Sequence, residues 1–519
     1  MARRAQPISV GLWVGAAAAA LILMLTLGTL GAVMHRAGSF SGFGPADWAA
    51  IRFTLLQASL SALISVALAI PVARALARRQ FPGRGLLITL LGAPFILPVI
   101  VAILGLLAVF GRNGLLNIAL SWAGIEPVSI YGLQGVLVAH VFFNLPLATR
   151  LILQGWLSIP SERFRLAASL NFRADDVNRL LGRPMLRAVV PGALVVIFVI
   201  CMTSFAVALT LGGGPRSTTV ELAIYQAFRF DFDLGHAALL SVVQFGLSAL
   251  AAVLAAWIAV PGFSGAGLDR PVLRWDARRG WLRALDALWI GLAALFLLLP
   301  LGMVVGQGVA SLFSLPPQVF GAALRSVLVA VGSACLMLAL ALPLSVAAVR
   351  AGRLFEVIGT LAIAASPLVI GTGLFILLRP VADPVALALP VTALVNAVMS
   401  LPFALRALLP ALREVEATYG HLADSLGMRG WARLRLLLVP RLRRPIGFSM
   451  GLAAALSMGD LGVIALFADP SQATLPLQLY RLMGSYRLDQ AAGAALLLLG
   501  LSLALFWLFD RGGRVNADA

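Results

Sequence analysis

The feature that most constrains this chain is a series of long apolar runs separated by arginine-rich segments. A helix needs about 20 apolar residues to cross the roughly 30 Å hydrocarbon core of a bilayer. Of the 519 residues, 61% are hydrophobic and 12% are charged, about half the charged fraction of soluble proteins. This composition excludes a water-soluble or disordered chain and predicts an all-α polytopic membrane protein. We predict twelve transmembrane helices, at residues 11–34, 53–76, 86–110, 133–155, 189–211, 236–260, 284–306, 322–349, 355–378, 384–408, 446–468 and 490–509.

Arginines gather in alternate loops between these runs, and they predict the orientation of the chain. Residues 74–84, 150–187, 270–283 and 413–444 are rich in arginine, whereas the other connecting loops are nearly neutral. Basic loops stay in the cytoplasm, so both termini are expected there. A net charge of +18 could also suggest a nucleic-acid partner. The placement of the arginines favours membrane orientation instead, and we expect no nucleic-acid binding.

The sequence contains no lysine, so all 39 basic residues are arginine. A Walker A loop needs its lysine to reach the nucleotide phosphates. The chain therefore carries no P-loop ATPase of its own. Its two cysteines, Cys201 and Cys335, lie in apolar runs and give neither a disulfide framework nor a metal-ligand spacing. No catalytic triad or metal cluster stands out, so we expect a chain that is not an enzyme.

Two of the basic segments match each other at a spacing of 256 residues. Leu166–Asn171 aligns with Leu422–Gly427, and Pro184 aligns with Pro440. Earlier runs also repeat, at slightly different spacings. Six helices per half would keep the two halves parallel, as in transporters whose halves are related about the membrane normal.

This repeat predicts a division of the chain into three parts. The first six-helix half would cover residues 1–262, and the second would cover residues 284–519. A polar cytoplasmic linker at 263–283 would join them.

Each half carries a short amphipathic pattern inside its long basic loop. The shared pattern is a pair of leucines four residues apart, followed by a residue that tolerates a left-handed turn and later by a proline. In the two halves these are Leu166, Leu170, Asn171 and Pro184, and Leu422, Leu426, Gly427 and Pro440. A helix, a sharp turn and a second short helix would form a compact cytoplasmic knob at 160–187 and at 415–445. The alternative is an amphipathic segment on the lipid surface, which would not require the same spacing twice.

The knob pattern resembles the coupling motif of ABC importer permeases, in which Glu-Ala-Ala precedes a Gly and a later Pro. The second half keeps Ala423, Gly427 and Pro440. The first half keeps Ala167 and Pro184. The remaining motif positions differ from the consensus, with His421 and Leu422 in one half and Arg165, Leu166 and Asn171 in the other. In that family the knob docks on a cytoplasmic ATPase, which the missing lysine also requires.

Further stretches resemble the fused, double-length permeases of the iron(III) and thiamine branches, and most closely the bacterial thiamine permease. They are Tyr131–Pro146, Leu211–Gln226, Ser457–Phe467 and Gly484–Arg487. The resemblance implies the permease subunit of an importer for thiamine and its phosphates in the bacterial inner membrane. It also implies two copies of a separate ATPase, which bind the ATP and Mg, and a periplasmic binding protein. The alternatives are an ABC permease for iron(III) or another small solute, and a secondary transporter with six-plus-six repeats.

Asp460 is the main acid expected inside the membrane, near the middle of the eleventh run. A carboxylate in hydrocarbon costs about 2.5–3.5 kcal/mol on insertion scales, so it should face a cavity or a partner. It could attract the fixed cation of thiamine, or it could be a structural acid bonded to a neighbouring helix. His140 and Asn144 lie in the fourth run, where a lone histidine is usually a packed, hydrogen-bonded residue.

Three further candidates lie after the fifth run, on the outer side. Gly213 would let the backbone turn sharply, or would simply end the helix. Glu221 and Tyr225 would lie where a binding protein docks or a gate closes, and a solvated loop is the alternative.

Overall fold

The computed structural model describes residues 10–37, 43–91, 96–258, 280–363, 365–467 and 470–514. Regular structure in these residues is helical, with no strand. The helices up to residue 258 are α1 (Val10–Leu23), α2 (Thr29–Ala37), α3 (Pro45–Arg78), α4 (Arg84–Leu90), α5 (Val99–Phe110), α6 (Leu115–Trp122), α7 (Leu133–Leu157), α8 (Ser161–Ser169), α9 (Ala174–Val177), α10 (Arg183–Met202), α11 (Ala206–Leu211), α12 (Val220–Arg229) and α13 (Leu234–Ile258). Those from residue 280 are α14 (Gly280–Ser311), α15 (Pro317–Ala351), α16 (Leu354–Thr360), α17 (Pro367–Leu378), α18 (Ala388–Ser425), α19 (Gly430–Arg433), α20 (Val439–Arg441), α21 (Arg443–Met458), α22 (Gly462–Phe467), α23 (Leu475–Gly484) and α24 (Leu488–Arg514).

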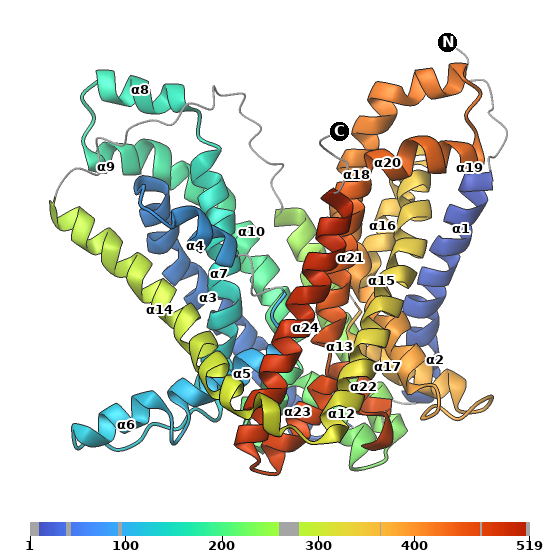
Figure 1. The fold of residues 1–519 in the computed structure, drawn as a ribbon, viewed down its shortest axis with the longest axis horizontal. Helices are drawn as coiled ribbons and strands as arrows, with labels where there is room; N and C mark the ends of the chain where they lie inside the picture. The colour runs from blue at the N-terminus through green and yellow to red at the C-terminus, as the bar shows by residue number, and fades with distance from the viewer. Residues whose placement is uncertain are drawn as a thin grey trace.

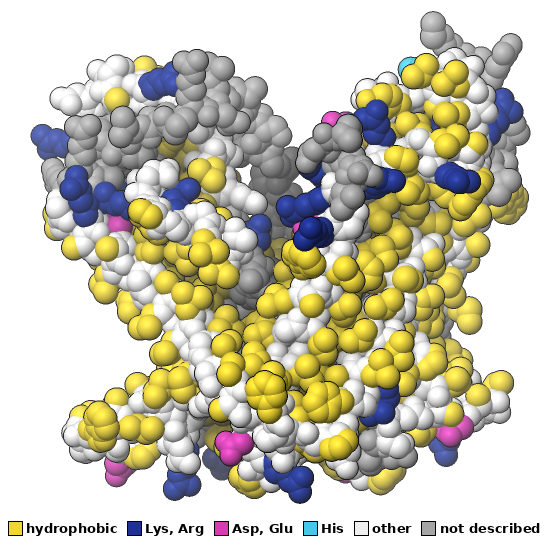
Figure 2. Space-filling model, viewed as in Figure 1, with side chains coloured by type: hydrophobic (Ala, Val, Ile, Leu, Met, Phe, Trp, Pro, Cys, Tyr) yellow, Lys and Arg dark blue, Asp and Glu magenta, His cyan; other side chains and the backbone are white. Residues whose placement is uncertain are grey.

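Eleven helical segments of the described residues are long and apolar enough to cross a membrane. The all-α polytopic class is therefore confirmed. The expected ninth span, 355–378, consists of two shorter helices, α16 and α17, of which α17 is apolar but only 12 residues long. The number twelve stays a prediction. Figure 2 shows the matching surface, with hydrophobic side chains over the middle of the molecule and arginines gathered mainly at one end.

The molecule has two arms that join at one end and separate toward the other (Figures 1 and 2). One arm contains α3, α7 and α10, and the other contains α15, α18 and α21. The separated ends carry the short helices α8 and α9 on one arm and α19 and α20 on the other. Helix α1 starts and helix α24 ends on this same side.

The first long helix of each chain half packs on the opposite arm. Helix α1 packs against α15 and α16, and α14 packs against α3 and α5 as well as against α24 of its own half. A Cβ atom on Gly105 of α5 would lie only 2.5 Å from the carbonyl oxygen of Pro300 in α14, so a glycine is needed for this close approach. At the knob end, Asp286 of α14 forms an ion pair with Arg79 at 2.7 Å. The halves predicted at 1–262 and 284–519 are thus segments of sequence that interlock in space. Most of the predicted linker, 263–283, lies outside the described residues.

Two expected spans are interrupted inside their length. The fifth breaks between Met202 and Ala206, and the eleventh breaks between Met458 and Gly462. Asp460 therefore lies inside the expected eleventh span, at a helix break that the sequence did not predict. The physical reason is local, because Asp460 at the break accepts the backbone N–H of Gly462 at 3.1 Å.

Candidate functional site

The two helix breaks occur at the same place in both halves. The end of α10 and both bounds of α11 recur, 256 residues later, in α21 and α22. A helix break leaves backbone carbonyl groups without their helical hydrogen bonds. Away from water, these groups need other hydrogen-bond donors within the protein. In the first half, Gln57 of α3 donates to the carbonyl oxygen of Cys201 at 2.9 Å, and Gln244 of α13 donates to that of Met202 at 3.2 Å. These amides stabilise an open backbone turn inside the protein.

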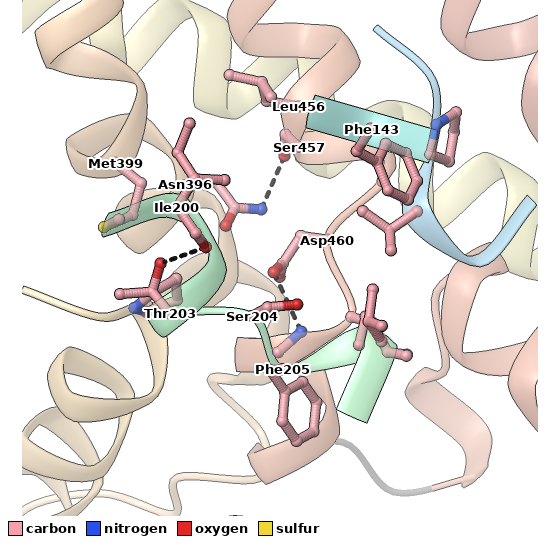
Figure 3. Close-up of a pocket in the computed structure, with 18 of the residues that line it drawn as sticks. Phe143, Ile200, Thr203, Ser204, Phe205, Asn396, Met399, Leu456, Ser457 and Asp460 are labelled. Atoms are coloured by element: carbon pink, nitrogen blue, oxygen red, sulfur yellow. Dashed lines mark hydrogen bonds between the residues drawn. The ribbon is translucent and has the colours of Figure 1, made fainter. Parts of the chain in front are cut away.

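Both breaks open onto one cavity of about 390 Å³ between the arms (Figure 3). Its wall is formed by α7, α10, α11 and α12 on one side and by α17, α18, α21 and α22 on the other. Three phenylalanines, Phe143, Phe205 and Phe403, contribute apolar surface. Among the described lining residues, Glu221 and Asp460 are acidic and none is an arginine. The cavity is therefore suited to a polar solute with an aromatic part and a positive charge.

His140 and Asn144 line this cavity from α7. The Nδ1 atom of His140 lies 3.0 Å from the hydroxyl oxygen of Ser61, and its Nε2 atom lies 2.8 Å from that of Ser204. Asn144 donates to the backbone carbonyl of His140 at 2.8 Å and to the sulfur of Cys201 at 3.2 Å. His140 is thus both a buried, hydrogen-bonded residue and part of the cavity wall.

Asp460 faces the same cavity from the second half (Figure 3). One carboxylate oxygen accepts the backbone N–H of Gly462, whereas Oδ2 is buried and has no partner among the described residues. Nearby, the side-chain amide of Asn396 donates to Ser457 at 3.0 Å. An unsatisfied buried acceptor is unfavourable by about 1–3 kcal/mol, more for a charged group. The free oxygen is available to a group entering the cavity.

Glu221 is not in a solvated outer loop, because it lies in the wall of the cavity and is fully buried. Its helix, α12, is outside the eleven long apolar segments. Neither carboxylate oxygen has a hydrogen-bond partner among the described residues. Burial raises the pKa of Glu221 to about 8. The polar side chains of Ser366 and Gln244 lower this pKa, but by less than burial raises it. The structure therefore brings Glu221 together with Asp460, His140 and Asn144.

Gly213 and Tyr225 do not line the cavity. Gly213 has a left-handed φ of 73°, and a Cβ atom there would lie 2.9 Å from Cβ of Tyr131, so the sharp turn requires glycine. Tyr225 is buried behind the wall and stacks edge-on against Phe205, with ring centroids 5.2 Å apart. Tyr225 thus supports a lining residue without reaching the cavity itself.

The candidates missed by sequence reasoning are mainly small polar residues. They are Ser204, Asn396, Ser400 and Ser457. The signal that could have found them was the spacing of 256. Applied to His140 it gives Asn396, and applied backwards to Asp460 it gives Ser204.

The two knobs have matching backbones. Asn171 and Gly427 both adopt left-handed φ values, 56° and 65°, so the expected turn is present in each. A π-helical segment follows at the same spacing, Asn178–Gly182 in one knob and Leu434–Leu438 in the other.

Four leucines project from the knobs with more than half of their surface exposed. They are Leu166, Leu170, Leu422 and Leu426. Beneath them, Ala167 in the short helix α8 and Ala423 near the end of the long helix α18 are buried. Pro184 lies in the first turn of α10, and Pro440 lies in α20. The role of these residues in coupling to an ATPase stays a prediction.

The interiors of the two knobs differ. In the first, Phe164, Ala167 and Val177 form a small apolar cluster. In the second, Arg433 is nearly buried and binds the carboxylates of Glu416 and Asp424. Burial alone would lower the pKa of Arg433, but the two carboxylates outweigh it and raise that pKa above its ordinary value. The first knob is therefore stabilised by packing, whereas the second combines an apolar cluster around Leu438 and Leu442 with a buried charge network.

The fold and the cavity define a membrane permease, in which two helical arms enclose a largely apolar cavity that holds two acidic side chains. No family model matches the chain. Curated relatives do, over almost its whole length. It is 39% identical to the thiamine transport system permease protein of Brucella melitensis, over 97% of this chain and 96% of the relative. It is 40% identical to those of Salmonella typhimurium, over 98% of each chain, and Escherichia coli, over 91% of this chain and 90% of the relative. The chain belongs to the family of thiamine transport system permease proteins.

Proposed function

We propose that this chain is the membrane permease of an ATP-driven importer that carries thiamine and its phosphates across the bacterial inner membrane. The observation that carries the proposal is full-length identity of 39–40% to thiamine permeases. The cavity supports it independently. Thiamine combines a thiazolium ring of fixed positive charge with a flat aminopyrimidine. Asp460 offers an unpartnered carboxylate oxygen for the first, and the phenylalanines offer apolar surface for the second.

The surfaces of the two knobs favour a separate ATPase as the source of energy. Their exposed leucines form two similar apolar patches on the arginine-rich end of the molecule. Exposed apolar groups of this kind mark surfaces that bind other proteins. Two copies of one ATPase would occupy the two knobs and bind the ATP and Mg, and their closure would move the arms. A periplasmic binding protein would deliver the solute at the opposite end, with both termini of this chain in the cytoplasm.

The first test is uptake of labelled thiamine by cells that lack their own thiamine permease. The cells express this chain with its candidate ATPase and binding protein, and each component is also omitted in turn. We expect uptake only when all three are present. Uptake without the ATPase would refute an ATP-driven mechanism in favour of a secondary transporter. Absence of thiamine uptake, with the ATPase still co-purifying on this chain, would refute thiamine as the substrate. The assignment as an ATP-driven importer would stand.

A second test concerns Asp460. Asp460→Asn keeps the size of the side chain and removes its charge. We expect uptake of thiamine to fall about tenfold or more, because a charge-assisted contact is lost. The ATPase should still co-purify with the variant. Normal uptake would remove Asp460 from the solute pathway.

A further inference from the structure

The two walls of the cavity are built from matching positions but differ in charge. At the spacing of 256, His140 corresponds to Asn396 and Ser204 corresponds to Asp460. All four residues line the cavity, and Figure 3 shows Ser204, Asn396 and Asp460 among its walls. A symmetric fold thus presents a histidine–serine pair on one side and an asparagine–aspartate pair on the other.

Around His140 and Ser204 the first-half wall is a neutral hydrogen-bonding surface, and the acid of this half, Glu221, lies apart from them in α12. Both ring nitrogens of His140 are held by hydroxyl groups, Nδ1 by Ser61 and Nε2 by Ser204. A hydroxyl group has one donor and two acceptor positions, so Ser204 can make a further hydrogen bond while it holds His140. This wall can therefore bind a neutral polar group of a solute.

The second-half wall carries the charge. Asn396 donates one of its two amide hydrogens to Ser457, and Asp460 keeps Oδ2 buried without a partner among the described residues. A cationic group in the cavity would pair with this oxygen and offset the unfavourable burial of the carboxylate. No such oxygen exists at the matching position of the first half, where Ser204 stands.

We propose that the solute crosses this cavity in one orientation, with its cationic group against Asp460 and a neutral hydrogen-bonding group against the His140–Ser204 pair. The proposal rests on the proposed transport of thiamine, whose thiazolium and aminopyrimidine rings meet these two requirements. The residue beside each position decides whether a carboxylate there is free to bind the solute. A carboxylate at position 204 would lie within reach of Nε2 of His140 and would pair with it in place of the solute.

Glu221, the other acid of the cavity, is separate from this pair of positions. It belongs to α12, whose N-cap Thr219 corresponds to Thr474 at a spacing of 255. That spacing matches Glu221 with Pro476, so this acid also occurs in one half only. Glu221 stays unchanged in every variant below, so that its contribution to the cavity is constant.

The decisive experiment moves the carboxylate from one wall to the other. Thiamine uptake is compared for wild type, Asp460→Ser and the exchange variant Ser204→Asp/Asp460→Ser, with the ATPase and binding protein present. We expect Asp460→Ser to lower uptake about tenfold or more, and the exchange variant to stay within about twofold of it, because the restored charge faces His140. Recovery of half or more of wild-type uptake in the exchange variant would overturn the proposal, since charge alone would then suffice. Absence of uptake by wild type would refute the proposed function instead.

A second measurement keeps the proposal testable if the exchange variant fails to insert, which its membrane abundance and ATPase co-purification report. Competition against labelled thiamine uses two analogues, one with an uncharged ring in place of thiazolium and one with oxygen in place of the pyrimidine amino group. Asp460→Asn should lose discrimination against the uncharged ring and keep discrimination against the altered pyrimidine. Ser204→Ala should do the reverse. Equal losses of both discriminations in both variants would overturn a fixed orientation.

Discussion

Val177 and Arg433 occupy the same position in the two knobs, 256 residues apart, and stabilise them by different forces. Val177 is buried in an apolar cluster, whereas Arg433 binds Glu416 and Asp424. Burying a valine removes apolar surface from water and depends little on salt. An arginine with two carboxylates depends on its charge, and removing it leaves both acids without that partner. The two knobs should therefore respond differently to mutation.

Arg433→Val should loosen the second knob. The change leaves Glu416 and Asp424 close together without their shared cation, and we expect a local loss of about 1–3 kcal/mol. Amide hydrogen exchange over residues 416–434 should become about tenfold faster or more. Arg413→Ala is the matched control, because the Arg413–Glu356 pair is half-exposed and should contribute less than about 1 kcal/mol. Equal effects of the two changes would contradict a buried charge network.

Gly427→Val should uncouple ATP hydrolysis from transport. The φ of 65° at Gly427 is left-handed, and a residue with a side chain pays about 1–2 kcal/mol to adopt it. A distorted turn would misplace Leu426 and with it the apolar patch. We expect ATPase activity to remain while thiamine uptake falls several-fold.

The first knob supplies the control for this turn. Asn171 already adopts a φ of 56°, so Asn171→Gly should leave uptake unchanged, whereas Asn171→Val should act like Gly427→Val. If the first knob is the weaker coupling site, as its departures from the motif suggest, Asn171→Val should cause the smaller loss. Equal losses would refute that asymmetry, and full uptake by Gly427→Val would count against docking through the turn.

Glu221 should make stability fall as pH rises. Its pKa in the folded protein is about 8, against about 4.5 for an ordinary glutamate. Between these values the folded state keeps a proton that the unfolded state has lost. The associated stability is complete below about pH 4.5 and is lost by about pH 8, on the order of a few kcal/mol.

The thermal unfolding of the protein in detergent, measured from pH 5 to pH 8.5, checks this sign. Relative to wild type, Glu221→Gln should become progressively more stable as pH rises. Glu126→Gln is the control, because Glu126 is exposed. Parallel curves for wild type and Glu221→Gln would show that the carboxylate is not buried as described.

Gly105→Ala should separate α5 from α14. Its Cβ atom would lie 2.5 Å from the carbonyl oxygen of Pro300 and 3.1 Å from Cγ2 of Val304, so one helix must shift. We expect a loss of about 1–3 kcal/mol in unfolding free energy. Gly302→Ala, in α14 itself, has open space around the new methyl group and should be neutral or stabilising by up to about 1 kcal/mol. A harmless Gly105→Ala would argue against the exchange of helices between the halves.

The sequence alone determined the membrane class, because apolar runs of bilayer length have few other folds available to them. It also determined the left-handed turns at Asn171 and Gly427, since residue type and spacing act locally. Asp460 and His140 stood out because a polar or charged side chain inside the hydrocarbon is unfavourable unless it faces a cavity or a partner.

Tertiary structure alone decided which of these residues meet. Helix exchange placed α14 on α3 and α5, and no local pattern encodes such packing between segments more than 150 residues apart. The break at Ser204 depends in part on distant partners, Gln57 and Gln244, which donate to the freed carbonyl groups of Cys201 and Met202. Glu221 looked like a loop residue because it follows the polar segment 216–219, and it is buried only because α12 folds back between the arms. A cavity is a property of surfaces brought together, so its walls became known only from the fold.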